Sequence, residues 1–110
     1  MAVKFQTQAP EALLAPLKKA IDDGKAPTWS YDKDGDFTHT PDQWRNKAWM
    51  RPSVSSSGLD VNIVKPKDGT ISWKVYAIYS GRFIELAINH AHDDYTLASA
   101  TSKPISGDLV

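Results

Sequence analysis

The segment Leu59-Asp-Val-Asn-Ile-Val-Lys-Pro-Lys-Asp-Gly-Thr-Ile-Ser-Trp-Lys-Val-Tyr-Ala-Ile-Tyr79 gives the clearest indication of the fold. Apolar and polar side chains alternate from Leu59 to Ile63, which predicts a half-buried strand. Residues 65–69 have the composition of a turn. Residues 71–79 alternate again and predict a second strand. We therefore expect Val61 and Val75 to lie on paired antiparallel strands.

The segment that follows, residues 82–93, fits two structures. As a strand, it would place Ile84, Leu86 and Ile88 on one face. As a helix, it gathers its polar side chains into one stripe at helical spacing. The stripe consists of Arg82, Glu85, Asn89, His92 and Asp93. The helix explains these positions better, and we predict a helix near residues 82–93.

Towards the N-terminus, leucines at helical spacing predict a helix that ends at Gly24. Pro16 conflicts with a helix interior, so we expect the helix to begin near Ala15, with the proline in its first turn. Aromatic and polar residues then alternate on both sides of Asp34-Gly35, which indicates a β-hairpin. Thr40-Pro41 has the pattern of a helix start and predicts at most two helical turns, with Trp44 on them.

The remaining segments predict two more strands and a tail. Residues 48–54 look extended, and Pro52 places them at a sheet edge or outside the sheet. Residues 95–101 predict a strand with Leu97 facing inward. Residues 103–110 are expected to form a mobile tail.

This order of elements predicts an α+β fold in a single globular domain, residues 1–110. We expect an antiparallel sheet of four to five strands, an N-terminal helix and the second helix near residues 82–93.

Composition narrows the classes of function. The chain has 110 residues, equal numbers of basic and acidic side chains and no cysteine. Disulfides, thiolate metal sites and a cysteine nucleophile are thereby excluded. A net charge of zero disfavours a dominant electrostatic grip on nucleic acid or on a membrane. No apolar run is long enough to span a bilayer, and the first residues lack a signal-peptide pattern, so we expect a soluble cytoplasmic protein.

Two groups of residues suggest metal binding. Asp32-Lys-Asp34-Gly-Asp36 resembles the start of a calcium loop, but Phe37 and Gln43 occupy positions where such a loop needs Gly and Glu. A hairpin tip explains these carboxylates better. The second group, His39, His90, His92 and Asp93, suits a metal site only if residues 90–92 form a strand. This group supports an alternative function, a divalent-metal-binding protein or a metal-dependent hydrolase.

Other chemistry has less support. No nucleophile elbow, phosphate-binding loop or cofactor motif is present, so we expect no cofactor and name no catalytic residue. Aromatic residues alternate with cations, which allows a second alternative, a single-strand nucleic-acid binder. The aromatic residues in this pattern are Trp29, Tyr31, Trp44, Trp49, Trp73, Tyr76 and Tyr79.

The least regular part of the chain, residues 44–51, is the predicted interaction surface. It contains Trp44, Arg45, Trp49, Met50 and Arg51. Trp, Tyr and Arg are enriched at binding hot spots, and a tryptophan in an irregular segment is hard to bury. We therefore predict a small interaction or regulatory domain that binds another protein or forms a homo-oligomer, with a homodimer expected.

Overall fold

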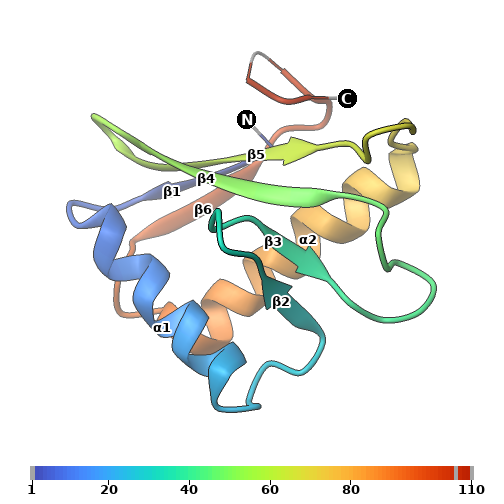
Figure 1. The fold of residues 1–110 in the computed structure, drawn as a ribbon. Helices are drawn as coiled ribbons and strands as arrows, with labels where there is room; N and C mark the ends of the chain where they lie inside the picture. The colour runs from blue at the N-terminus through green and yellow to red at the C-terminus, as the bar shows by residue number, and fades with distance from the viewer. Residues whose placement is uncertain (1, 106, 110) are drawn as a thin grey trace.

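A computed structural model describes residues 2–105 and 107–109 of the chain. Six strands and two helices make up this part (Figure 1). In chain order they are β1 (Val3–Gln6), α1 (Pro10–Asp22), β2 (Trp29–Tyr31), β3 (Phe37–His39), β4 (Trp49–Ser55), β5 (Gly58–Val64), α2 (Trp73–Ala91) and β6 (Leu97–Ala100).

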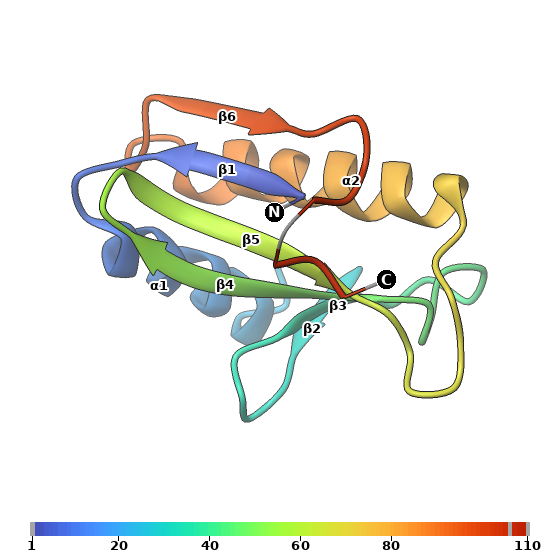
Figure 2. The same ribbon diagram turned by 90° about the horizontal axis from the view of Figure 1, so that it is seen from above.

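The strands form one antiparallel sheet in the order β2-β3-β4-β5-β1-β6, and both helices cover the same face of it (Figures 1 and 2). The predicted α+β class is confirmed, but the sheet has six strands rather than four to five. The sequence analysis missed β1, because four residues are too few to show a period. β1 is nevertheless an interior strand of the sheet, since it pairs with β5 on one side and with β6 on the other.

Helix α2 overturns the prediction of a strand at residues 71–79. Val61 pairs with Val3 and Pro52, not with Val75. Ser72 caps the helix by accepting a hydrogen bond of 3.1 Å from the Val75 N–H. Short alternating segments fit both periods, and the buried stripe that continues at helical spacing to Ala91 decides for the helix. The helix predicted near residues 82–93 is therefore present, but it begins at Trp73.

Helix α1 begins at Pro10 rather than near Ala15, so Pro16 lies inside it. A proline inside a helix costs about 3 kcal/mol. Leu13 and Leu17 are fully buried on the face that packs towards the sheet, and burial of each contributes about 1.5–3 kcal/mol. Their burial offsets the cost of the proline. Gly24, at φ +74°, ends the helix as predicted.

Two smaller predictions were wrong. Residues 41–46 form a turn instead of a helix, with the N–H groups of Trp44 and Arg45 both donating to the Pro41 carbonyl. Leu97 is 53% exposed rather than inward-facing. Its register places it opposite the exposed Gln6, whereas Ala98 lies opposite the buried Phe5.

The predicted hairpin around Asp34-Gly35 and the predicted strands at residues 48–54 and 59–63 are present as β2–β3, β4 and β5. The expectation that Pro52 places this segment at a sheet edge or outside the sheet is wrong, because β4 lies between β3 and β5. Pro52 pairs with β5 on one side, and on the other side β4 meets β3 only at Met50. No residue of β3 lies opposite Pro52, so the missing N–H of the proline breaks no hydrogen bond to β3.

The C-terminal tail returns to the sheet. The Asp108 carboxylate accepts a hydrogen bond of 3.0 Å from the Ile63 N–H, and Leu109 forms a parallel bridge to Val64. The tail predicted to be mobile, residues 103–110, also contains Ser106 and Val110, which lie outside the described residues. The movement of this tail stays a prediction.

The core lies between the sheet and the two helices. Phe83 of α2 makes edge-to-face contacts with Phe5, Trp29 and Phe37, at centroid distances of 6.1, 5.5 and 5.4 Å. These rings belong to β1, β2 and β3, so one helical residue joins three strands. Within the described ranges, neither helix is both long and apolar enough to cross a membrane.

Gly81→Ala should raise the free energy of unfolding by about 0.5–1 kcal/mol, because glycine in a helix interior costs conformational entropy. Gly81 is exposed within α2, and nothing lies within 4 Å of the position a Cβ would take. Urea unfolding followed by circular dichroism measures the change. Gly58→Ala is the matched control and should destabilise the protein strongly. Gly58 has φ +149°, which is unfavourable for alanine, and the added Cβ would collide with the Phe5 carbonyl oxygen. Destabilisation by Gly81→Ala would contradict the helix at this position.

Candidate functional site

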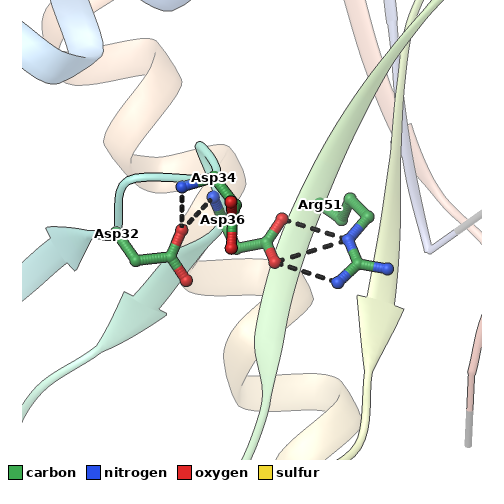
Figure 3. A network of polar contacts seen from close by, with 4 residues as sticks. All are labelled: Asp32, Asp34, Asp36 and Arg51. Atoms are coloured by element: carbon green, nitrogen blue, oxygen red, sulfur yellow. Dashed lines mark hydrogen bonds and ion pairs between the residues drawn. The ribbon is translucent and has the colours of Figure 1, made fainter.

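The three carboxylates that resemble a calcium loop lie at the β2–β3 turn (Figure 3). Asp32 accepts hydrogen bonds from the N–H groups of Asp34 and Asp36, at 2.9 and 3.0 Å. The Asp36 carboxylate pairs with Arg51 of β4, with Nε at 3.1 Å and Nη2 at 3.0 Å. Asp32 and Asp36 are thus engaged within the fold, and the ion pair fastens the hairpin to β4.

The histidines predicted as metal ligands occupy different settings. His39 is buried on β3, with its ring centroid 4.8 Å from Trp29 and 6.0 Å from Tyr79. His90 lies in the last turn of α2, and His92 follows the helix with Nδ1 2.8 Å from the Ile88 carbonyl. Asp93 lies beside His92, with 3.8 Å between Nε2 and Oδ2. Among the described residues, no three His, Asp or Glu side chains converge as a metal ion would require.

The predicted surface at residues 44–51 is divided between two faces of the molecule. Met50 is fully buried in the core, which places its neighbours Trp49 and Arg51 on the opposite, helix-free face of β4. Trp44 is half-buried against the core on the α2 side. Arg45 is exposed and forms an ion pair of 3.2 Å with Asp42. Strand alternation therefore separates Met50 from Trp49 and Arg51, while Trp44 and Arg45 lie in the turn before β4.

Trp44 instead lines a groove that runs along α2. Three hollows of about 270, 110 and 190 Å³ adjoin one another there. The first two share Thr28 and Glu85, and the last two share Lys25 and His90. We call this the α2 groove. Its sides are formed by α1 at the far end, by residues 25–28 and by side chains of α2 and of the turn after β3. The lining residues of α2 are Arg82, Glu85, Asn89 and His90, and those of the turn are Pro41, Gln43 and Trp44.

Tyr79 fixes one side of the α2 groove. Its hydroxyl donates a hydrogen bond of 2.6 Å to the Trp44 carbonyl. Thr38 Oγ1 lies 3.3 Å from the same hydroxyl. The backbone of the turn that carries Trp44 is therefore attached to α2 through the fully buried side chain of Tyr79.

The groove combines charged and neutral groups. Arg82 Nη1 lies 3.3 Å from both carboxylate oxygens of Glu85, and both side chains are about half exposed. Burial lowers the pKa of His39 below its usual 6.5, and Arg82 lowers it further, while the Thr28 carbonyl and Glu85 act in the opposite direction. His39 is thus neutral at pH 7. Its Nδ1 is buried and has no hydrogen-bond partner.

Another hollow, of about 360 Å³, lies beside β1 and is lined by Lys4, Gln6, Thr7, Gln8, Ser57 and Thr96. It contains no aromatic side chain and no carboxylate. The α2 groove has both, together with a buried histidine, and is therefore the stronger candidate site.

Part of this groove had a signal in the sequence. Arg82, Glu85 and Asn89 belong to the polar stripe that predicted the helix, and these three residues now line the groove. Lys25 and Thr28 had no such signal, because they reach the groove only through the position of the loop between α1 and β2.

Comparisons with protein-family models, with curated proteins and with solved structures gave no match. The function is therefore argued from the geometry of the groove.

His39→Gln should flatten the dependence of stability on pH. The native pKa of His39 lies below 6.5, so the unfolded chain takes up a proton before the native protein does as the pH falls. His39 therefore lowers the free energy of unfolding progressively as the pH falls through 6.5, the usual pKa of histidine, towards its lower native pKa. Urea unfolding at several pH values measures this slope. An unchanged slope in His39→Gln would contradict the assignment.

Arg51→Met should lower the free energy of unfolding by about 1–3 kcal/mol, because it leaves a buried carboxylate without its hydrogen-bond partner. The Asp36 side chain is 9% exposed, against 49% for Arg51. The double variant Asp36→Asn/Arg51→Met should lose less, since no buried charge then remains. Chemical unfolding at pH 7 compares the two, and a larger loss in the double variant would refute this role of the pair.

Proposed function

We propose that this chain is an interaction domain that binds an extended, acidic peptide segment of a partner protein in the α2 groove. The observation that carries the proposal is the connected row of hollows along α2, from Trp44 to α1. An elongated groove with charged and aromatic walls suits a peptide better than a compact small molecule.

The charges of the groove favour an acidic partner. Its lining contains three cations, Lys19, Lys25 and Arg82, and two carboxylates, Asp23 and Glu85. Lys19 is engaged by Asp23 at 2.7 Å, whereas Arg82 reaches Glu85 through one nitrogen at 3.3 Å. An exposed ion pair such as Arg82–Glu85 contributes little to the stability of the fold. A carboxylate of the peptide can therefore displace Glu85 from Arg82 at small cost.

Trp44 is the expected anchor of the complex. Its side chain is half-buried and packs against the core in the absence of a ligand, and its backbone carbonyl accepts the hydrogen bond from Tyr79. A side chain that is already ordered loses little conformational entropy on binding. Tryptophan and arginine together are typical of binding hot spots.

The two alternative functions have less support. Metal binding needs converging ligands, and the described residues contain no such group. Single-strand nucleic-acid binding needs exposed aromatic rings on a sheet. Tyr76 and Tyr79 lie in α2 and are buried, as is Trp29.

Selection from a random peptide library displayed on phage tests the proposal without assuming a partner. We expect selected peptides to be rich in Asp and Glu. Arg82→Ala should weaken their binding about tenfold, which corresponds to about 1.4 kcal/mol. Isothermal titration calorimetry measures the affinities.

Lys74→Ala is the matched control, because Lys74 is an exposed cation of α2 that does not line the groove. It should bind the peptides like the wild type. Selection of no peptides, or equal losses in the two variants, would refute binding in the α2 groove.

A further inference from the structure

We propose that two copies of this chain associate through β6, edge to edge, so that their sheets become continuous across a two-fold axis. Among the described residues, β6 ends the sheet order, with β1 on one side and no strand on the other (Figure 2). The predicted surface at residues 44–51 includes no residue of β6 and is not used. The proposal is independent of peptide binding in the α2 groove.

Within the part of the chain that the structure describes, the outer side of β6 presents backbone groups that no neighbouring strand pairs with. The Thr101 N–H donates to the Ala2 carbonyl at 3.0 Å, which makes Val3 and Ala100 a non-hydrogen-bonded pair. Because the pattern alternates along an antiparallel strand, the N–H and C=O groups of Ala98 and Ala100 point away from β1. An identical strand in the antiparallel direction can satisfy all of them.

β6 also lacks the devices that protect edge strands. Its sequence, Leu97-Ala-Ser-Ala100, contains no charge and no proline, and it pairs with β1 without a bulge. Charged residues, prolines and bulges normally prevent edges from pairing. The opposite edge differs in charge, since β2 is followed directly by Asp32-Lys33.

Charges at the two ends of β6 are complementary under a two-fold axis. Asp93 and Asp94 precede the strand, and Lys103 follows it. Asp93 has a side chain that is 95% exposed. Antiparallel pairing brings the acidic end of each copy next to the Lys103 end of the other. A parallel arrangement would instead place like charges together, so the charges select the two-fold symmetric dimer.

The backbone pattern fixes the register of this dimer. Ala98 of each copy exchanges hydrogen bonds with Ala100 of the other. Ser99 then lies opposite its own counterpart on the two-fold axis, as a non-hydrogen-bonded pair whose side chains approach closely. Leu97, half exposed in the single chain, gains a cross-strand neighbour in Thr101 of the second copy.

Cysteine cross-linking tests this register directly, because the chain has no cysteine of its own. Ser99→Cys should form a disulfide-linked dimer rapidly on treatment with diamide, seen on a non-reducing gel. Ser53→Cys is the matched control, since Ser53 is an exposed serine in β4, away from β6. It should remain monomeric on the gel. Equal cross-linking of both variants, or none with Ser99→Cys, would overturn the proposal.

Sedimentation equilibrium of the unmodified chain gives a second measurement. We expect a concentration-dependent dimer of the 12.2 kDa chain. Ala100→Lys should convert the dimer to a monomer, because it places a charge next to the N–H and C=O groups of residue 100 that pair with the second copy. Circular dichroism should show that the fold of this variant is intact. A monomer at all concentrations in the unmodified chain, or a dimer retained by Ala100→Lys, would refute the β6 interface. Ala100→Lys should still bind the selected peptides, which separates this test from that of the groove.

Discussion

The packing of Phe83 against three strands is the interaction on which the rest of the structure depends. Its ring contacts aromatic side chains from β1, β2 and β3, which are brought together only in the folded chain. Edge-to-face pairs of this kind contribute about 0.5–1.5 kcal/mol each beyond the area they bury. Phe83 therefore fixes both the position and the rotation of α2. Arg82 and Glu85, its neighbours in the chain, face the groove because of that rotation.

The packing of α2 against the sheet also forms the groove, because it buries Tyr79 next to the turn at residues 41–46. Because α2 lies under the sheet, Tyr79 is buried within hydrogen-bonding distance of the turn at residues 41–46. This contact holds Trp44 over the helix, while the loop at residues 25–28 forms the other part of the wall. The candidate site is thus built on the core, and two connecting segments held against α2 complete its walls.

Because both helices lie on one face of the sheet, they do not cover the backbone groups at its two edges. The helices cover the apolar face, and the backbone groups of the outer strands have to be satisfied in another way. At β2 the strand is short and charged residues follow it. At β6 the strand is neutral and unprotected. The unequal treatment of the two edges is the reason that a dimer would form at one of them.

The sequence by itself determined features whose cause is local. The Asp34-Gly35 hairpin follows from turn chemistry, the strand at residues 59–63 from alternation, and the polar stripe of Arg82, Glu85 and Asn89 from helical spacing. Together these were enough for the α+β class. Only the tertiary structure decided that residues 73–79 are helical and that Val3–Gln6 is a central strand, because short segments fit either period and are fixed by their neighbours. It alone brought His39, Trp44 and Arg82 into one groove. Contacts between residues so far apart in the chain arise from packing, which no local pattern encodes.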